Sequence, residues 1–338
     1  MRVPEEIPMP GARYRFICLY CLVFILMLVP QLRAEDCYTG SDIDPTTKAA
    51  LERTASQFFD MAVRGDFASL KQAAIPGLSS NFGSVETAIS DNKANFQGAQ
   101  ATIRSLFLLR AAGSSTLSRA EFFCGIFNSS DRTGFQINNL APGTYGIVVQ
   151  DVQGGKAPFA LSFILQQMQG QWKLGGFYAR ATQIAGHDSG WFLSQARQYK
   201  AAGKTHNAWF YYLTAWDLEA PLPFISTGAL DKIADEMQST RPTDLPPAAQ
   251  LQLSGNGKTY NISDVFAAPV PSGLDLVVKY PSPDISNSQQ TFADNMAVIS
   301  AIVARYPEFR DAFVGVVARA VAPGGSDYGS ELPMKNIK

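Results

Sequence analysis

Side chains that bind metals or transfer protons are scarce in this chain of 338 residues. It has two histidines, His187 and His206, and only two of its four cysteines, Cys37 and Cys124, lie beyond the N-terminal segment. Zinc sites need clusters of His and Cys at short spacings. We therefore predict no metal site, and no motif indicates a cofactor.

Motifs for nucleophilic and phosphate chemistry are also missing. The chain contains no Gly-x-Ser-x-Gly elbow, the turn that presents a nucleophilic serine. The segment 255–259 (Gly-Asn-Gly-Lys-Thr) resembles the end of a phosphate-binding loop. However, Gln252 stands where that motif needs glycine, and a strand rather than a helix is expected to follow. A turn is therefore predicted at 255–259. The sequence predicts neither a catalytic serine nor a phosphate-binding loop.

The two histidines have simple structural interpretations. Asp188 follows His187 in a loop. A catalytic pair of the two is one alternative, but adjacent residues of an extended loop point apart, and the expected role is capping of the next helix by Asp188 or Ser189. His206 stands near the start of a second helix and is expected to be a solvated surface residue.

Three carboxylates in the first half of the chain are the remaining candidates for proton transfer: Asp60, Glu121 and Asp151. A carboxylate in an apolar pocket has a raised pKa and can transfer protons. Each of the three is more simply explained as a solvated or capping charge.

Charge restricts the class of partner. Lys and Arg number 28 and Asp and Glu number 29, so the net charge is −1. Duplex nucleic acid and anionic membranes attract surfaces with an excess of basic residues. Nucleic acid is therefore excluded as a predicted partner.

The first 34 residues have the features of a secretory signal peptide. Arg13 and Arg15 precede an apolar run, 16–29, and Ala34 is the small residue after which signal peptidase cuts. A helix needs about 20 apolar residues to cross a bilayer, so we expect cleavage and export to the periplasm or the medium. The alternative is an uncleaved membrane anchor formed by residues 16–30.

Cleavage would leave Cys37 and Cys124 as the only cysteines and a net charge of −3. An oxidising compartment favours a disulfide between such a pair, which would join the N-terminal arm to the first domain. Because the sequence does not provide the distance between the two Cα atoms, two free thiols are the alternative.

Residues 43–182 are predicted to form an α+β domain. Asp44 and Pro45 are typical of a helix start, and helices are expected over 45–64, through residue 74 and over 84–96, where Ser84 would be the cap. From Ala101 the pattern changes to strands separated by Gly, Pro, Asn or Ser. The expected strands are 101–110, 120–128, 135–140, 143–152, 159–168 and 171–180. Short turns between the last three predict an antiparallel meander with helices over one face.

This order of elements, with a last strand that contains Gln171-Trp-Lys-Leu-Gly-Gly-Phe-Tyr178, resembles the nuclear-transport-factor-2-like superfamily of cone-shaped folds. The resemblance covers residues 43–182. It implies a curved antiparallel sheet. The superfamily includes isomerases, dehydratases, small-ligand binders and interaction domains, so the fold alone does not define a function. Enzymes of this group use a buried carboxylate or a His/Asp pair, often with a tyrosine.

Apolar side chains alternate along the later strands of this domain. Phe159 and Phe163 share one face of their strand, and Tyr145 and Ile147 share one face of theirs. Such a face either packs against helices or lines a cavity. The candidate ligand-binding residues are Tyr145, Ile147, Phe159, Phe163 and Trp172.

The rest of the chain is predicted to have three parts. Aromatic and small residues at helical spacing over 189–219 resemble one tetratricopeptide-type helical hairpin, and with a connector helix this part covers 188–240. Residues 241–249 have the composition of a proline-rich linker. Residues 250–338 are predicted to form a small second α+β domain. Its expected elements are a hairpin around 255–257, strands at 274–280 and 312–321, and a helix at 288–305.

These features favour an exported, non-catalytic protein that binds an apolar small molecule or an envelope protein. One alternative is an isomerase- or dehydratase-type enzyme that uses a pocket carboxylate of the cone-shaped domain. Another is an envelope scaffold held by an uncleaved N-terminal helix, the one case in which a membrane is an expected partner.

Overall fold

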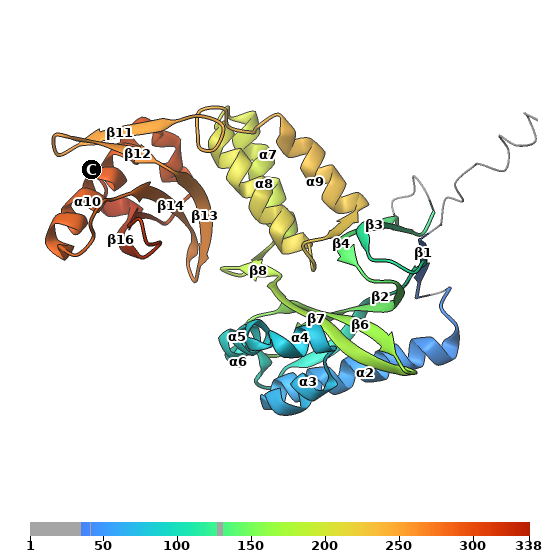
Figure 1. Cartoon of the computed structure of the whole chain (residues 1–338). Coiled ribbons are helices and arrows are strands. Elements are labelled where there is room, and N and C mark those ends of the chain that lie inside the picture. Colours follow the sequence, from blue (N-terminus) through green and yellow to red (C-terminus); the bar gives the residue numbers. More distant parts are fainter. Residues whose placement is uncertain (1–34, 41, 127–130) are drawn as a thin grey trace, which may run out of the picture. The chain divides into compact units, whose positions relative to one another are not determined.

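The computed structural model describes residues 35–40, 42–126 and 131–338 (Figure 1). The predicted signal peptide at 1–34 and the alternative anchor at 16–30 lie outside the described residues. Helices pack on mostly antiparallel sheets, so the fold class is α+β, as predicted. Among the described residues, no helix is long and apolar enough to cross a membrane.

The first helices begin and end where the sequence supplies caps. In α2 (Pro45–Arg64), Asp44 accepts a hydrogen bond of 2.9 Å from the Thr47 amide, and Gly65 ends the helix with a φ of 68° that favours glycine. The helix expected over 84–96 is two helices, because the Asn92 side chain bonds back to the Ala88 carbonyl and the chain turns there. Ser84 is not its cap, since the helix already begins at Gly83. The shorter helices are α3 (Phe67–Ala73), α4 (Pro76–Ser80), α5 (Gly83–Asp91) and α6 (Lys93–Phe96).

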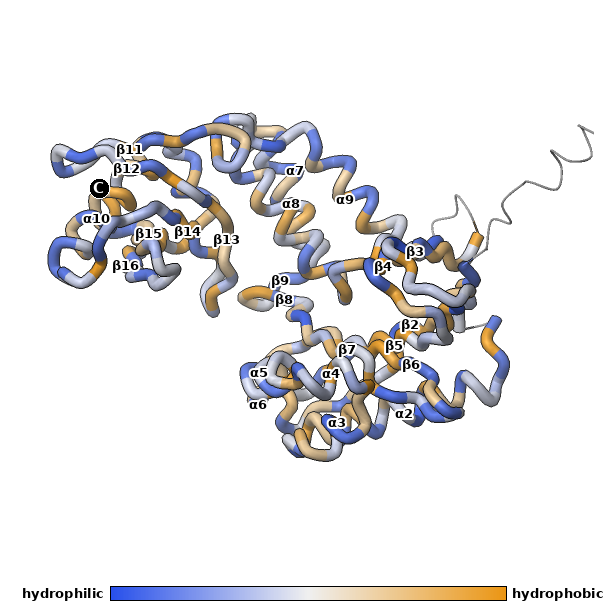
Figure 2. Tube along the Cα trace, viewed as in Figure 1, coloured by the Kyte–Doolittle hydropathy of each residue, from blue (hydrophilic) through white to orange (hydrophobic). Residues whose placement is uncertain are grey.

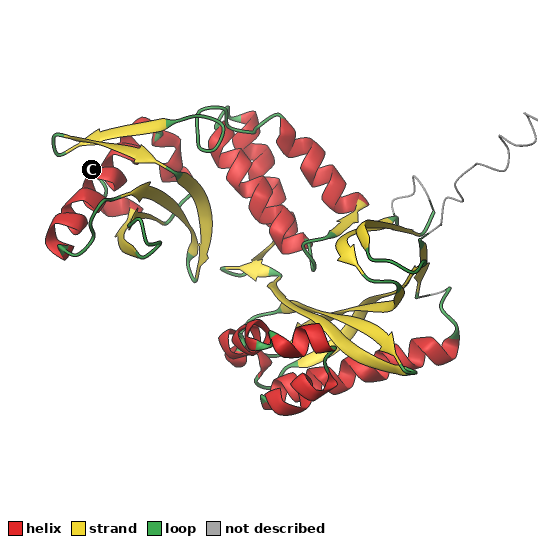
Figure 3. Ribbon diagram, in the orientation of Figure 1, coloured by secondary structure: helices red, strands yellow, loops and turns green. Residues whose placement is uncertain are grey.

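A five-stranded antiparallel sheet organises the first half of the chain. Its order is β1-β2-β5-β6-β7, and the last three strands form the predicted meander. Helices α2 to α6 cover one face of this sheet (Figure 3), where their apolar residues and those of β6 form a buried core. The strands are β1 (Asp36–Thr39), β2 (Gln100–Ala111), β5 (Gly143–Gln153), β6 (Phe159–Met168) and β7 (Gln171–Ala181).

The opposite face of this sheet is also covered. β3 (Leu117–Cys124) and β4 (Thr133–Leu140) leave the main sheet and pair with β10 (Ile225–Thr227) in the order β10-β4-β3. Phe135 of this small sheet packs on Phe107, with ring centroids 5.0 Å apart. Figure 2 shows hydrophobic stretches in β2 and β5, whose central residues 106–109 and 147–149 are buried, as expected where both faces of a strand are covered. The strand expected over 120–128 is β3, which ends at Cys124.

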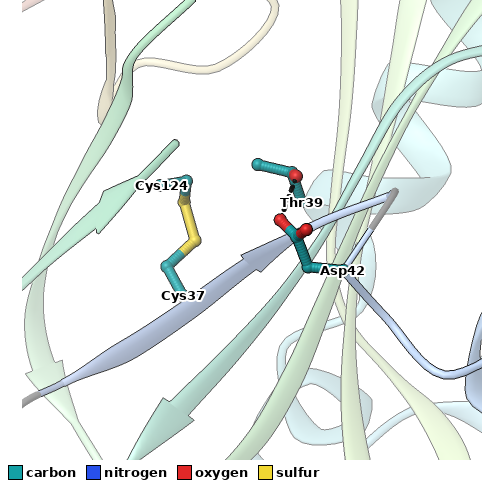
Figure 4. The surroundings of a disulfide bond; sticks show 4 residues. All are labelled: Cys37, Thr39, Asp42 and Cys124. Atoms are coloured by element: carbon teal, nitrogen blue, oxygen red, sulfur yellow. Dashed lines mark hydrogen bonds between the residues drawn. A yellow bond between two sulfur atoms is a disulfide. The ribbon is translucent and has the colours of Figure 1, made fainter. Parts of the chain in front are cut away.

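A disulfide joins β1 to β3 (Figure 4). The Cα atoms of Cys37 and Cys124 are 5.0 Å apart, within the range that such a bond requires. In addition, the Glu35 side chain accepts a hydrogen bond from the Glu121 amide. The start of the folded chain is therefore held against the small sheet.

The predicted helical hairpin follows two short strands, β8 (Gln183–Ile184) and β9 (His187–Asp188). Its helices are α7 (Ser189–Ala201) and α8 (Thr205–Glu219), and α9 (Gly228–Gln238) comes next. Residues 241–249 are not an exposed tether, because Leu245 is buried in the hydrophobic core formed with α8. The burial of Leu245 could not be predicted from the sequence, because a single apolar side chain in a proline-rich polar segment gives no periodic signal.

The C-terminal sheet has the order β13-β14-β15-β16 and one parallel pair, β14 with β15, which α10 connects. Its core is continuous with the hairpin: Phe210 of α8 packs on Phe309 and Phe313, with centroid distances of 6.1 and 5.8 Å. The turn predicted at 255–257 does join two antiparallel strands. The elements are β11 (Leu251–Gly255), β12 (Lys258–Ile262), β13 (Asp264–Val270), β14 (Gly273–Pro281), α10 (Ser288–Arg305), η1 (Pro307–Asp311), β15 (Gly315–Val321), β16 (Asp327–Pro333) and η2 (Met334–Asn336).

Removal of the disulfide is expected to destabilise the fold. The bonded residues are separated by 87 positions, and loop closure of this size is worth about 4 kcal/mol in the chain-entropy model. Replacing Cys37 and Cys124 together by Ser should lower the free energy of unfolding by about 2–4 kcal/mol in urea denaturation. Each single Ser variant should lose as much as the double variant, because either one breaks the bond. Additive losses from the two single variants would contradict this prediction.

Candidate functional site

Three of the five residues predicted to bind a ligand lie on the side of the sheet that the helices cover. Phe159 and Phe163 are fully buried there, and their rings contact Phe96 at 5.1 Å and Phe58 at 6.0 Å. Trp172 packs at the edge of the same core and is partly exposed. Side chains from the helices therefore fill the space against this face of the sheet, where the predicted ligand would have to lie.

Tyr145 and Ile147 lie on the other face of the sheet, in the core formed with the small sheet. The register pairs Ile147 with Ile164 and not with Phe163, so the two candidate sets point in opposite directions. The Tyr145 hydroxyl donates a hydrogen bond of 2.7 Å to the Ala141 carbonyl, and burial raises the pKa of Tyr145. The structure does not bring the five residues together in one cavity.

The three candidate carboxylates are solvated or paired with arginine. Asp60 is exposed on α2. Glu121 is exposed and accepts a hydrogen bond of 2.6 Å from Arg119. Asp151 accepts a bond of 2.8 Å from the Nε of Arg104. None of these carboxylates lies in an enclosed pocket beside a tyrosine hydroxyl, the arrangement that proton transfer in a cone-shaped enzyme would need.

The loop histidine has an aromatic partner. The His187 ring stacks on Trp191 with centroids 3.8 Å apart and an interplanar angle of 13°. Asp188 accepts a hydrogen bond of 2.9 Å from the Trp191 amide and caps α7, so Asp188 is the cap and Ser189 the first helical residue. His187 and Asp188 therefore have separate roles and do not form a catalytic pair.

The prediction that His206 is a solvated surface residue is wrong. Its ring is largely buried, with Nδ1 2.5 Å from Glu308 and Nε2 2.8 Å from Asp244. His206 is buried because three segments that are distant in sequence meet at this point. They are α8, residues 241–249 and η1, and each contributes one of the three side chains. Helical spacing describes α8 alone and could not show that two other segments cover its first turn.

This cluster can hold segments together but cannot easily act on a substrate. Both ring nitrogens of His206 already lie within hydrogen-bonding distance of carboxylate oxygens, so neither is free to meet a substrate. Burial works to raise the pKa of Asp244, but the hydrogen bond and the charge of His206 outweigh it, so that this pKa is lowered. The ring of Tyr306 lies 4.8 Å from the imidazole and covers it. We interpret the cluster as a structural clamp.

The most exposed hydrophobic side chains of the described residues lie on or beside the small sheet. Phe123 of β3 is 69 % exposed, and Ile126, just beyond β3, is 78 % exposed. Phe123 borders an open hollow of about 550 Å³ and a smaller one of about 110 Å³ next to it, and Ile126 borders the smaller one. Gly134 lies at the floor of both, directly opposite Phe123 in the register.

The hollow above Gly134 exists because the central strand has no side chain there. Ser226 of β10 flanks Gly134 on the other side, and Phe224 adds an aromatic wall that is fixed by a contact with Tyr178 at 5.8 Å. A Cβ added at Gly134 would meet no atom closer than 3.7 Å. Close packing therefore does not require glycine here, and the open space is a surface feature of the small sheet.

Charged groups around this hollow are paired with each other. Arg119 binds Glu121, and Arg132 donates a hydrogen bond of 2.7 Å to Asp231. Asp231 also accepts a bond of 2.7 Å from Ser226. The rim is thus polar but has no unpaired excess of either sign among these groups.

The sequence analysis missed this surface, although a signal was present. Phe122 and Phe123 are adjacent in a strand, and adjacent strand residues point to opposite faces. Phe122 is buried, so Phe123 must face outwards. Because β3 was not known to pair outside the main sheet, its outer face could not be assigned.

The described residues contain no group of three or more His, Cys, Asp or Glu side chains arranged to hold a metal ion. In comparisons with known proteins, no family model matches the chain, and no curated protein or solved structure is significantly similar to it.

Loss of the clamp is expected to destabilise the fold. His206→Ala would leave the carboxylates of Asp244 and Glu308 near each other without the ring between them. Because the Asp244 side chain is 46 % exposed, the expected loss is smaller than for a fully buried pair, about 1–2 kcal/mol. The lowered pKa of Asp244 means that its carboxylate stabilises the fold above about pH 4 and that this contribution is lost as the pH falls further. Asp244→Asn should therefore reduce the loss of stability between pH 5 and pH 3 in urea titrations, and exposed Asp60→Asn should not. Equal acid sensitivity of Asp244→Asn and the unmodified protein would contradict the role of the clamp.

Proposed function

We propose that this chain is an exported, non-catalytic interaction module, and that a partner protein inserts an apolar side chain into the hollow above Gly134. The observation that carries the proposal is the exposure of Phe123 and Ile126 beside this hollow. Apolar side chains gathered on a protein surface are typical of interaction sites. Export rests on the apolar segment and cleavage site within residues 1–34.

The composition of this surface favours a protein as the partner. An aromatic and aliphatic centre with a polar rim is the usual composition of protein interfaces, and their binding energy is concentrated in a few anchor side chains. The rim pairs, Arg119 with Glu121 and Arg132 with Asp231, balance in charge. A nucleic acid or another polyanion would need an excess of cations.

The shape of the hollow supports the same class of partner. Pockets for small molecules bury most of the ligand surface, whereas this hollow is open along the outer face of the small sheet. A side chain carried by a partner protein would be covered from above by the partner itself. The isomerase or dehydratase alternative has no comparable support, because Asp60, Glu121 and Asp151 are solvated or bound to arginine.

The resemblance to the nuclear-transport-factor-2-like superfamily is kept as part of this proposal. That superfamily includes domains whose role is interaction alone. In this chain one face of the main sheet is filled with helix side chains, such as Phe58 and Phe96, which supports a member of that kind.

The proposed contact surface is tested with the photoreactive amino acid p-benzoylphenylalanine at position 123, in the exported protein in its producing cell. We expect one discrete crosslinked partner protein. The same probe at Phe292, which is 48 % exposed on α10, should not crosslink that partner. Equal products from both positions, or none from position 123, would contradict the proposal.

The hollow itself is tested with the purified partner. Gly134→Val fills it with a residue that favours strands, and the neighbouring atoms leave room for the added Cβ. We expect the affinity for the partner to fall at least tenfold, about 1.4 kcal/mol, with unchanged thermal unfolding. Unchanged affinity would show that the partner binds elsewhere.

Cleavage of the signal segment is tested by mass spectrometry of the exported protein. The expected N-terminal residue is Glu35, directly after Ala34. A protein that retains residues 16–30 and fractionates with membranes would instead support the anchored alternative.

A further inference from the structure

A second concave site lies in the later part of the chain. A pocket of about 320 Å³ forms where β8, β9, α7 and α8 meet the turn before β14 and the segment before β15. Its volume is in the range of small-molecule sites, which often form where separate packing units meet. It shares no lining residue with the hollow above Gly134.

One wall of this pocket is a stack of two aromatic rings. His187 and Trp191 lie nearly parallel, and an edge contact with Phe192 at 4.9 Å holds Trp191 in place. Both rings of the stack are partly exposed, whereas Phe192, Leu274 and Phe313 are buried at the base. The site therefore has a flat aromatic wall whose two rings are partly exposed, and another ring can pack on such a surface.

The polar groups of the lining are few and carry little net charge. Asp311 and Ser272 are exposed, and Lys204 Nζ lies 2.8 Å from a carboxylate oxygen of Asp311. The hydroxyl of Tyr211 donates to the Ala312 carbonyl at 2.8 Å, so it is already engaged. Burial raises the pKa of Tyr211, which keeps this phenol neutral.

We propose that this pocket binds the ring of a neutral sugar. One face of a sugar ring is made of C–H groups that pack on flat aromatic surfaces, and its hydroxyls both donate and accept hydrogen bonds. The carboxylate of Asp311, the hydroxyl of Ser272 and the imidazole of His187 supply the matching acceptors and donors.

Other ligand classes fit this lining less well. An anionic ligand would need a cation, and the lining contains neither Lys nor Arg. A cationic ligand would need a carboxylate that is not already paired, but Asp311 is paired with Lys204. A flat aromatic compound would use the ring wall but would make no use of the hydrogen-bonding groups of Asp311, Ser272 and His187.

Free sugars and sugar units of a cell-surface polysaccharide share this chemistry. The test therefore has two arms, both by isothermal titration calorimetry on the exported protein. One arm uses glucose, galactose, mannose, N-acetylglucosamine and their common disaccharides, and the other uses soluble neutral polysaccharides such as dextran and β-glucan. We expect binding in at least one arm, and a preference for the polymers would identify a polysaccharide as the source.

The site is identified with a matched pair of substitutions. Val314 lines the pocket and is 40 % exposed, and Val63 is 39 % exposed on α2. Val314→Trp should fill the pocket and weaken sugar binding at least tenfold, whereas Val63→Trp should leave it unchanged. Trp191→Phe keeps an aromatic wall, so it should retain binding within a few-fold but lose the change in tryptophan fluorescence that the sugar causes.

The proposal is overturned if no sugar in either arm binds with a dissociation constant below about 10 mM, or if binding survives Val314→Trp. It is also overturned if only indole, phenol or charged compounds bind and Val314→Trp removes their binding. Crosslinking from position 123 involves none of these residues, so it fails or succeeds independently.

Discussion

Strand β5 buries side chains on both faces of the five-stranded sheet. Val148 and Val152 face the helices, while Ile147 and Val149 face the small sheet. A sheet without a solvated face needs a cover on each side, and helices α2 to α6 and strands β3, β4 and β10 provide the two covers. The space on both faces of this sheet is therefore filled by packing, which leaves the outer surfaces of the two covers for the proposed contacts. The open hollow above Gly134 lies on the outside of one of them.

The second constraint is the shared core of the later residues. Phe210 of the helical hairpin packs on Phe309 and Phe313, so the hairpin and the C-terminal sheet bury each other's aromatic residues. A single helical hairpin exposes too much apolar surface to be stable alone, which explains why residues 188–240 and 250–338 do not form independent cores. The pocket beside Trp191 lies at the boundary of these two packing units, where turns and strand ends leave space that side chains do not fill.

Sequence periodicity predicted the elements well and their partners poorly. The strands expected at 143–152, 159–168 and 171–180 differ from β5, β6 and β7 by one residue at most at each end, because period-two patterns and glycine turns are local properties. The separation of β3 and β4 from the main sheet depends on β10, about 90 residues later, and has no local signal. For the same reason alternation correctly indicated that Phe159 and Phe163 share a face but could not show that helices cover it. The burial of His206 depends on Asp244 and Glu308, which are far away in sequence.

The charged side chains of this protein are largely used to join its elements, and the two proposed sites depend on shape. Its charged side chains form cross-links between elements, such as Arg197 of α7 with Glu236 of α9, where the hydrogen bond from Arg197 lowers the pKa of the carboxylate. Groups paired in this way are poor proton donors and acceptors near neutral pH, because the pairing stabilises their charged forms. By contrast, the two proposed sites, beside Phe123 and beside Trp191, are aromatic, and their charged groups are paired. Binding at such surfaces depends on removing apolar area from water and on the fit of rigid rings, so both proposed sites rest on shape more than on charge.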